Sequence, residues 1–369
     1  MSITQELLDE VIAAFDFGSD PIYPQTYGCG HVNDTFLIQI RANNNLYPRY
    51  VLQRLNPEAF KDPEGLMRNV IGISEYLCER VRENGGDCSR EAMEFIRPLS
   101  GGLFYRDSTG CAWRAYRYID RVRCYQSANT PELFAASGRA FGRFQRMLCD
   151  YPADTLFETI PRFHDTEDRL AKLKSAIAED KFARVAECER EIAFALEREA
   201  DCSVAMQAMR DRRLPLRVTH NDTKLNNVLF DENSGEAACV IDLDTVMPGL
   251  SIYDFGDSIR FGANHCAEDE KDLSKMSLDL EMYEAYATAF VEGAGSALTS
   301  AEIDYLPWGA KLMTLECGIR FLTDYLSGDT YFHIQRPGQN LDRCRTQFKL
   351  VADMENHWDE MNAITSKLK

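Results

Sequence analysis

The chain is poor in basic residues, since its 369 positions hold 41 Lys and Arg against 59 Asp and Glu. The resulting net charge of −18 repels nucleic acid and anionic membrane surfaces, so we expect neither as a partner. No apolar run approaches the roughly 20 residues that a membrane-spanning helix needs. The first ten residues resemble a polar helix start rather than a signal peptide, which predicts a cytoplasmic protein.

Paired cysteine motifs are also missing, although the chain has twelve cysteines. No C-x-x-C occurs, and the closest neighbours, Cys78 and Cys88, are ten positions apart. This spacing favours neither a zinc site nor a disulfide framework. We therefore expect buried free thiols, as in a reducing compartment.

The first 120 residues predict a small antiparallel sheet. Four short runs rich in β-branched or aromatic residues predict strands at 35–41, 49–55, 94–99 and 111–119. Between the second and third runs, apolar residues at helical spacing begin after Asp62-Pro63 and end near Gly85. One helix is therefore expected to pack on the sheet.

From residue 130 onward the pattern changes to amphipathic helices, predicted at 131–149, 166–209, 277–291 and 301–326. Two apolar stretches, 228–230 and 239–243, are separated by the turn 231–235 and predict a hairpin inside this helical region. The expected fold class is α+β, with one domain at 1–120, a second at 121–369 and a junction at 119–121.

The segment HNDTKLNN at 220–227, followed after the hairpin by Asp242, carries the strongest chemical signal. Phosphoryl transfer from ATP needs a carboxylate at the acceptor hydroxyl and oxygen ligands that hold Mg²⁺. Asp222 supplies the carboxylate, Asn227 stands five positions later as in kinase catalytic loops, and Asp242 ends a strand beside them. Lys224 can neutralise charge that develops on the γ-phosphate.

The segment at 220–227 taken alone could consist of turn residues that cap a hairpin. That explanation does not account for the segment together with the hairpin and Asp242. A hairpin and a second acid at the expected distance favour a catalytic loop instead. His220 is interpreted differently. Because phosphoryl transfer needs only one base, we expect His220 to orient the loop backbone.

A glycine-bearing turn, YGCGHVNDT at 27–35, precedes an apolar strand and predicts a loop that covers phosphates. Gly28 and Gly30 allow the backbone N–H groups to approach phosphate oxygens. Asn33 stands where a third glycine would be in G-x-G-x-x-G, so a plain hairpin is the alternative. The early position, upstream of Asp222, favours the phosphate loop.

The strand after this turn carries Arg54 where kinases usually place a lysine. A guanidinium can also bind α- and β-phosphate oxygens. Its acidic partner is expected on the following helix, where Glu64 and Glu75 are both candidates. Arg68, by contrast, occupies a place on that helix where an acid would be expected.

These blocks resemble the aminoglycoside phosphotransferase and choline kinase superfamily, and within it the N-acetylhexosamine 1-kinases. The resemblance rests on YGCGHVNDTF at 27–36, VLQRLN at 51–56, HNDTKLNNVLF at 220–230, VIDLDTVMPG at 240–249 and GIRFLTDYLSGDTYF at 318–332. It implies a bilobal, protein-kinase-like fold in which a small antiparallel-sheet lobe binds ATP at a hinge around Ile119. A helical lobe would hold the acceptor and Mg²⁺.

The resemblance also implies transfer of the ATP γ-phosphate to the anomeric hydroxyl of N-acetylglucosamine or N-acetylgalactosamine. Asp222 would contact that hydroxyl, and Asn227 and Asp242 would bind Mg²⁺. The residues that would line the sugar pocket are His31, Asp34, Phe261, Arg320 and Tyr331.

Residue chemistry near the C-terminus independently suits a sugar, because charged, planar and aromatic side chains gather at 320–331. Ion pairs on a helix surface would use the same residue types. Two other functions are also considered. One is a kinase of another small alcohol, of the aminoglycoside, choline or homoserine type. The other is a regulatory pseudokinase, against which the intact Asp222, Lys224, Asn227 and Asp242 argue.

Overall fold

The computed structural model describes residues 3–18, 22–27, 32–42 and 45–369. The chain divides into two compact units. The first unit consists of residues 1–124, 155–161 and 228–247, and the second of 125–154, 162–227 and 248–369. The first unit thus continues four residues past position 120, where the sequence placed the end of the first domain, and takes in two later segments.

The first unit is built on an antiparallel sheet with the strand order β1-β2-β3-β6-β4, and β5 also pairs with β6. The antiparallel sheet is as predicted, although β1 and β5 were not foreseen. Strands β2 and β3 align so that Asp34 lies opposite Arg54. The bounds are β1 (Ile22–Thr26), β2 (Asp34–Ala42), β3 (Asn45–Arg54), β4 (Phe95–Ile96), β5 (Tyr105–Arg106) and β6 (Ala112–Arg117).

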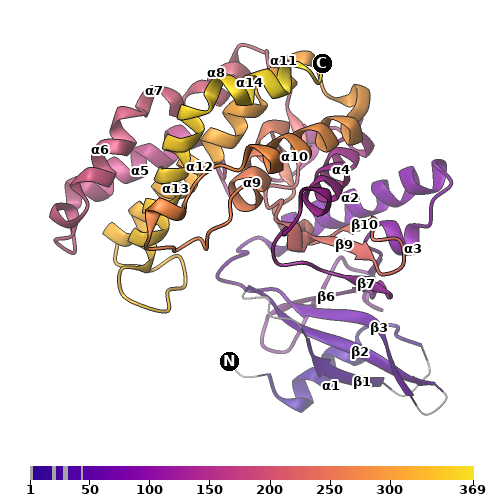
Figure 1. The fold of residues 1–369 in the computed structure, drawn as a ribbon. Coiled ribbons are helices and arrows are strands. Elements are labelled where there is room, and N and C mark those ends of the chain that lie inside the picture. The colour runs from indigo at the N-terminus through magenta and orange to yellow at the C-terminus, as the bar shows by residue number, and fades with distance from the viewer. Residues whose placement is uncertain (1–2, 19–21, 28–31, 43–44) are drawn as a thin grey trace. The chain divides into compact units, whose positions relative to one another are not determined.

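An N-terminal helix packs against this sheet through its apolar face. Helix α1 (Gln5–Ala13), at the indigo end of the chain in Figure 1, buries Leu8 and Val11 in a cluster with Trp113. Helix α2 (Pro63–Glu83) is the helix predicted from sequence. It begins where the Asp62 carboxylate accepts a hydrogen bond from Gly65 N–H, with a proline in its first turn.

The pairing of Cys78 with Cys88 corrects the expectation of free thiols throughout the chain. Cys78 lies on α2, and Cys88 begins the short helix α3 (Cys88–Glu91). The two form a disulfide, with Cα atoms 5.0 Å apart. The turn at residues 84–87 brings the two helices together, which sequence spacing alone does not reveal. Cys188, Cys202 and Cys344 are buried free thiols, as expected, whereas Cys124 is exposed.

The predicted hairpin is present, as β9 (Val228–Asp231) and β10 (Ala237–Val240). It belongs to the first unit and not to the helical one, which corrects its predicted location. Strand β7 (Val122–Arg123) pairs with β9, and the Arg90 guanidinium binds the Asp231 carboxylate at 2.7 Å. Strand β10 ends earlier than predicted because the chain enters a left-handed turn at Asp242.

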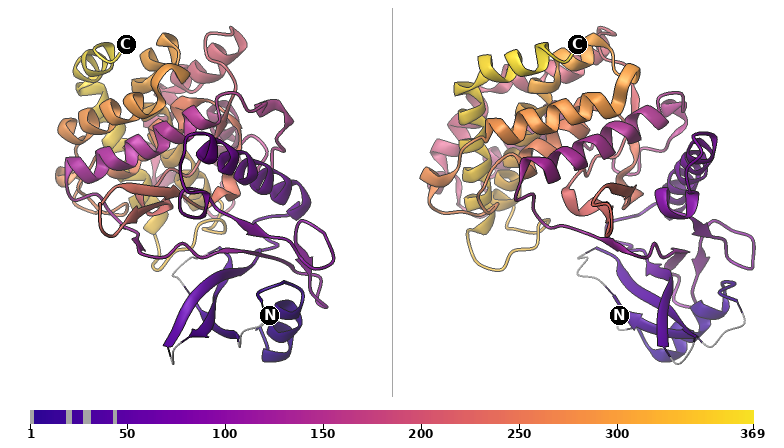
Figure 2. Two further views of the ribbon diagram at one scale, coloured as in Figure 1. Left: turned by 90° about the vertical axis from the view of Figure 1, so that its right-hand side faces the viewer. Right: turned by 45° about the vertical axis from the view of Figure 1, so that its right-hand side comes forward.

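The second unit is mainly helical, and Figure 2 shows α4 and α10 running side by side. No described helix is long and apolar enough to cross a membrane. Strands β8 (Arg217–Thr219) and β11 (Met247–Gly249) form a two-stranded pair. The helices are α4 (Pro131–Met147), α5 (Thr166–Glu179), α6 (Glu189–Glu197), α7 (Glu199–Cys202), α8 (Val204–Arg210), α9 (Ser251–Gly262), α10 (Leu280–Ala294), α11 (Ser300–Asp304), α12 (Leu306–Leu326), α13 (Gln339–Asn356) and α14 (Trp358–Ser366).

The single long helix expected over 166–209 is wrong, because the segment is divided into α5, α6, α7 and α8. Helix α5 stops at Asp180, whose backbone is left-handed at φ 36°. The Asp180 carboxylate then accepts hydrogen bonds from the N–H groups of Arg184 and Val185, which fixes a turn in place of another helical turn. Likewise, the helix predicted over 301–326 breaks at Tyr305, between α11 and α12.

Helices α9 and α12 cross at very short range through two glycines. A methyl group on Gly256 would collide with the backbone carbonyl of Gly309, and one on Gly309 would collide with that of Ile252. Because any side chain at either position would push the helices apart, glycine is required here for close packing rather than for backbone freedom. This crossing fixes α9 against α12, and both helices contribute to the candidate site.

Candidate active site

The loop at 220–227 follows β8 and is held from behind by a buried carboxylate of α9. Asp254 is fully buried and accepts hydrogen bonds from His220 N–H at 3.0 Å and Asn221 N–H at 2.8 Å. Gln145 donates to the same carboxylate at 2.6 Å. Burial raises the pKa of Asp254, although His220 and the backbone donors oppose the shift. Asn221 is left-handed at φ 64°, so the loop turns sharply just before Asp222.

A second carboxylate of α9 holds the next residue of the loop. Thr223 N–H donates to Asp257 at 2.9 Å, and the Thr223 hydroxyl donates to the carbonyl oxygen of Asp254 at 2.6 Å. Burial alone would raise the pKa of Asp257, but the Arg260 guanidinium at 2.8 Å outweighs it and leaves the pKa below its usual range. Asp254 and Asp257 therefore both hold the backbone of the loop at 220–227.

The structure brings the three polar residues predicted on this loop together. Lys224 Nζ lies 3.1 Å from the Asp222 carboxylate. Asn227 donates from Nδ2 to the Asp222 backbone carbonyl at 2.8 Å and to its carboxylate at 3.0 Å. Burial lowers the pKa of Lys224, but the neighbouring Asp222 carboxylate outweighs it and raises the pKa overall. Asp222 is thus a half-buried carboxylate held between a cation and an amide.

His220 has the environment of an orienting residue. Its ring is fully buried and lies edge-on to Phe141 and Phe144. Its Nδ1 accepts a hydrogen bond from Asp222 N–H at 3.3 Å. The ring therefore supports the backbone beside the carboxylate, in agreement with the interpretation from sequence.

Asp242, the second predicted metal ligand, lies in the first unit just before a short helical turn at Leu243–Thr245. Its backbone is left-handed at φ 62° and ψ 58°, an uncommon conformation for a residue with a side chain. Two residues later, Asp244 is buried and binds the guanidinium of Arg114 in β6, with Nη2 at 3.0 Å. The turn that carries Asp242 is thereby tied to the sheet.

The same network reaches the glycine-bearing turn and β3. Asn33 donates from Nδ2 to the Asp244 carboxylate at 3.0 Å and accepts from Asn56 N–H at 3.0 Å. Gln53 accepts two hydrogen bonds from Arg114, at 3.0 and 2.8 Å. The predicted phosphate-loop residue Asn33 is therefore linked to the predicted metal-binding turn. Gly28, Gly30 and the predicted sugar contact His31 lie outside the described residues.

Arg54 forms an ion pair with Asp34, at 2.6 Å, across the β2–β3 register. The two helix residues considered as its partner bind other arginines: Glu64 contacts Arg68, and Glu75 contacts Arg97. The acid that the structure places on Arg54 is thus a strand neighbour, which had been assigned to the sugar pocket. Pairing across a sheet depends on register, and the sequence did not fix that register.

The remaining predicted residues fall into separate environments. Ile119, expected at the ATP hinge, is a buried residue of the first unit. Arg320 and Tyr331 do meet in the second unit, with the guanidinium carbon 5.8 Å from the ring centre. Phe261 instead lines a cavity of about 360 Å³ that neither of those two residues lines.

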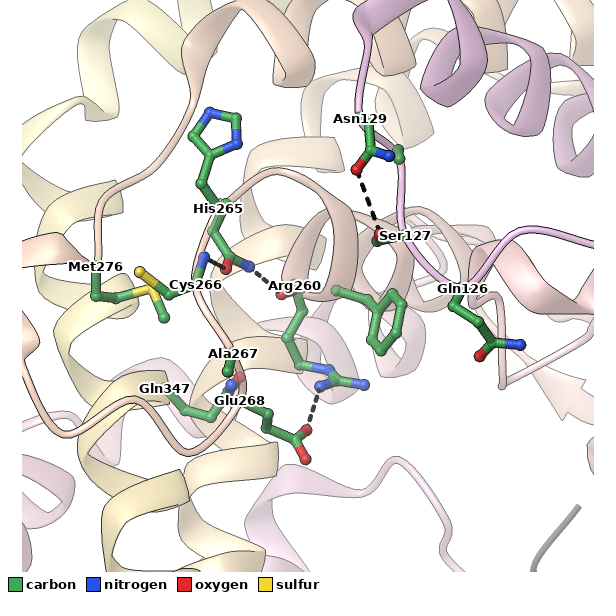
Figure 3. Close-up of a pocket in the computed structure, with 13 residues that line it drawn as sticks. Gln126, Ser127, Asn129, Arg260, His265, Cys266, Ala267, Glu268, Met276 and Gln347 are labelled. Carbon is green, nitrogen blue, oxygen red and sulfur yellow. Dashed lines mark hydrogen bonds and ion pairs between the residues drawn. The ribbon is translucent and has the colours of Figure 1, made fainter. Parts of the chain in front are cut away.

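That cavity is polar, and Figure 3 shows the Arg260 guanidinium and the Glu268 carboxylate pointing toward each other within it, 3.3 Å apart. Arg260 also binds Asp257, which holds the loop at 220–227. Two hydrogen bonds therefore connect the cavity with the backbone of Thr223. The lining residues are Gln126, Ser127, Ala128, Asn129, Arg260, Phe261, Asn264, His265, Cys266, Ala267, Glu268, Met276 and Gln347.

The two predicted metal ligands, Asn227 and Asp242, suit a cation that takes most of its ligands from water and from the substrate. Asn227 commits its amide nitrogen to Asp222, so its amide oxygen is the atom left to bind a metal. The described residues contain no group of three or more His, Cys, Asp or Glu side chains arranged to hold a metal. Mg²⁺ in phosphotransfer sites takes one or two carboxylates plus waters and substrate phosphates, and the Asn227 oxygen in the second unit and the Asp242 carboxylate in the first are each of a suitable type.

Comparison with known proteins identifies the family. A family model described as the phosphotransferase enzyme family matches residues 29–289, which is more than half of the chain. The chain belongs to the phosphotransferase enzyme family. The match contains residues 29–35 of the glycine-bearing turn, the loop at 220–227 and the turn at Asp242.

Solved structures show that this phosphotransferase has the protein-kinase-like fold expected from sequence. It is similar to a microcompartment-associated aminopropanol kinase, with a TM-score of 0.56, 14% identity and coverage of 97% of this chain and 98% of that one. A choline kinase from Cryptosporidium parvum Iowa II gives a TM-score of 0.56, 12% identity and coverage of 96% and 95%. An aminoglycoside phosphotransferase from Alicyclobacillus acidocaldarius gives 0.55, 12%, 100% and 97%.

The sequence reasoning missed the residues that support the phosphotransferase loop. Asp254 and Asp257 stand three apart in SIYDFGDS, a spacing that places both carboxylates on one face of a helix. That pattern was an available signal. Arg114 offered none, because its partner Asp244 lies 130 positions away.

Proposed function

We propose that this phosphotransferase transfers the γ-phosphate of ATP to the anomeric hydroxyl of N-acetylglucosamine or N-acetylgalactosamine. The observation that carries the phosphotransfer is the arrangement of Asp222 between Lys224 and Asn227, at 3.1 and 3.0 Å. A half-buried carboxylate fixed in this way can accept the proton of an attacking hydroxyl. The same arrangement argues against a pseudokinase.

Each residue then has a defined task. Asp222 orients the acceptor hydroxyl and takes its proton, while Lys224 neutralises charge on the transferring phosphoryl group. Asn227 and Asp242 would hold Mg²⁺, which when bound neutralises the β- and γ-phosphate oxygens. In the first unit, Asn33 and Arg54 are proposed to face the phosphates, and Ile119 to contact the nucleotide base.

The acceptor is proposed to bind Arg320 and Tyr331. The guanidinium lies within 5.8 Å of the ring centres of Phe163, Tyr331 and Phe332, and Tyr331 is 68% exposed. Aromatic faces pack on the apolar faces of sugar rings, and guanidinium N–H groups bind carbonyl and hydroxyl oxygens. His31, Asp34 and Phe261 are further proposed acceptor contacts that rest on the resemblance described above and not on contacts with Arg320 or Tyr331.

A choline- or ethanolamine-type acceptor is the alternative, because similar structures include kinases with those names. A quaternary ammonium group is normally recognised by aromatic rings without a competing cation. Here the aromatic cluster already surrounds Arg320, whose charge would repel a cationic acceptor. This observation favours an uncharged, oxygen-rich acceptor.

A matched pair of acceptors tests the proposal. Purified protein is incubated with ATP, Mg²⁺ and either N-acetylglucosamine or its 1-O-methyl glycoside, and phosphate transfer is followed by mass spectrometry. The free sugar is expected to be phosphorylated and the glycoside is not, because its reacting hydroxyl is blocked. Comparable transfer to the glycoside would refute the 1-kinase and leave a sugar kinase. Choline, ethanolamine, homoserine and an aminoglycoside complete the panel and identify the acceptor if neither sugar reacts.

A further inference from the structure

Three of the charged residues of α12 form one stripe along a helix that is mostly buried. Glu316, Arg320 and Asp324 follow one another at intervals of four, so they share one face. Glu316 is 2% exposed and Asp324 is 5% exposed. Buried carboxylates are costly unless they are hydrogen-bonded, so the partners of these two residues indicate what they do.

Asp324 binds the backbone of the segment that carries two of the rings around Arg320. Its Oδ1 accepts hydrogen bonds from the N–H groups of Thr330 at 2.9 Å and Tyr331 at 2.8 Å. Its Oδ2 accepts from Phe332 N–H at 3.0 Å and from Asn340 Nδ2 at 2.9 Å. Three consecutive backbone N–H groups therefore converge on one carboxylate, which fixes the segment 330–332 without any regular secondary structure.

Glu316 holds a second segment, which carries the third ring. His164 Nδ1 lies 2.9 Å from one Glu316 oxygen, and the Thr166 hydroxyl donates to the other at 2.9 Å. Burial raises the pKa of Glu316, but the neighbouring His164 outweighs it and keeps the pKa below its usual range. Arg169 donates to the carbonyl oxygen of Phe163 at 2.7 Å, so the backbone at 163–166 is also fixed.

Arg320 lies between these two carboxylates in sequence, but its side chain contacts aromatic rings. Its guanidinium contacts the rings of Phe163, Tyr331 and Phe332, with centre distances of 5.3, 5.8 and 5.4 Å. Among the residues that the structure describes, none forms a hydrogen bond or an ion pair with it. A guanidinium has five N–H donors, and ring contacts leave them unpaired. The side chain is half-buried, and its N–H donors are therefore available to an oxygen acceptor from outside the protein.

We propose that Asp324 and Glu316 are positioning residues that hold the two aromatic segments around Arg320, so that its N–H groups meet a carbonyl or hydroxyl oxygen of the acceptor. The two carboxylates touch the segments and not the acceptor. Their effect on acceptor binding therefore passes through Arg320. The identity of the acceptor rests on the proposed function, whereas the positioning role concerns only how Arg320 is held.

A double-mutant cycle tests whether Asp324 acts through Arg320. The variants are Asp324→Asn, Arg320→Ala and the combination, assayed with the acceptor that the wild-type protein phosphorylates in the panel above. Asp324→Asn is expected to raise the acceptor KM about tenfold and to change kcat and the ATP KM by less than about twofold. In the Arg320→Ala background the same change is expected to add less than about twofold. Independent, multiplicative effects on KM would overturn the proposal.

Hydrogen exchange measured by mass spectrometry provides a test that needs no acceptor. Asp324→Asn is expected to accelerate exchange of the amides at 330–332 in the unliganded protein, because their acceptor is weakened. Unchanged protection there would overturn the proposal whatever the acceptor is. Glu316→Gln serves as a second variant that tests the other segment, and faster exchange at 163–166 is expected for it. If the wild-type protein does not phosphorylate N-acetylhexosamines but the variants show these exchange changes, only the proposed substrate is refuted.

Asp353→Asn is the matched control. Asp353 also accepts a hydrogen bond from a backbone N–H, that of Leu278 at 2.7 Å, but it holds a segment that carries none of the three rings. Its substitution is expected to leave the acceptor KM and exchange at 330–332 unchanged. An equal rise in KM for this control would show a general loss of structure and would overturn the specific role of Asp324.

Discussion

Asn227 donates its side-chain amide to both the backbone carbonyl and the carboxylate of Asp222, at 2.8 and 3.0 Å. One residue thus fixes the position of the proposed base and leaves its own amide oxygen for a cation. Because the two residues are five positions apart on one loop, this geometry is local. In the proposed mechanism it would couple the placement of the base to that of the metal, which phosphoryl transfer requires.

Substitution of Asp222 is expected to separate catalysis from nucleotide binding. Asp222→Asn keeps the shape of the side chain but cannot accept a proton, so kcat should fall about 100-fold or more. The ATP affinity measured by calorimetry should change by less than about twofold, because Asp222 acts on the acceptor hydroxyl. Asp211→Asn, at an exposed carboxylate of the same unit, is the control. More than a tenth of wild-type kcat in Asp222→Asn would exclude the assignment.

Substitution of Asp242 is expected to weaken both Mg²⁺ and ATP. Asp242→Ala removes a proposed ligand of the Mg²⁺ ion, which would neutralise phosphate charge, so the Mg²⁺ concentration needed for half-maximal rate should rise at least about tenfold. Added Mg²⁺ should restore the rate only poorly. Glu236→Ala removes an exposed acid from the same hairpin and should leave the Mg²⁺ titration unchanged. A wild-type titration curve for Asp242→Ala would contradict the role.

The crossing of α9 and α12 gives a prediction about stability. Gly256→Ala places a methyl group against the backbone of Gly309, and the helices must separate to accept it. We expect the free energy of unfolding to fall by about 1–3 kcal/mol, measured in urea. Gly235→Ala is not a suitable control because that residue has a positive φ. Ser175→Ala, on the exposed face of α5, should change stability by less than about 0.5 kcal/mol.

The pH dependence of stability should report the buried pair of Glu302 and Arg217, which are 2.8 Å apart. Burial would raise the pKa of Glu302, but Arg217 and the Thr299 N–H outweigh it and lower the pKa below its usual value of about 4.5. A lowered pKa stabilises the folded state above the unfolded value, and the contribution is lost as pH falls through the folded value. Glu302→Gln should therefore cost about 1–3 kcal/mol at pH 7.

The difference between wild type and Glu302→Gln should shrink as the pH is lowered from about 4.5, where the carboxylate begins to protonate in the unfolded chain. Chemical denaturation of both proteins at a series of pH values measures this difference in the free energy of unfolding. A difference that is constant between pH 7 and pH 3 would show that the ion pair contributes nothing through charge.

Much of the site could be predicted because it is encoded locally. Asp222, Lys224 and Asn227 lie within six residues, so their spacing on a loop already brings them together, and the structure confirms that they meet. The strands β2 and β3 and the helix α2 were predicted for the same reason, since period-2 and period-3.6 patterns depend on neighbouring residues alone. The family followed from these local blocks.

The tertiary structure decided what depends on contacts between distant segments. Arg54 pairs with Asp34 because of strand register, Cys78 meets Cys88 because a turn folds back, and Arg114 binds Asp244 across 130 positions. By itself, the sequence determined the elements and the catalytic loop, because local periodicity and spacing encode them. It did not determine which buried charges become partners, because that choice is made by packing, where each charge must find the nearest group that can satisfy it.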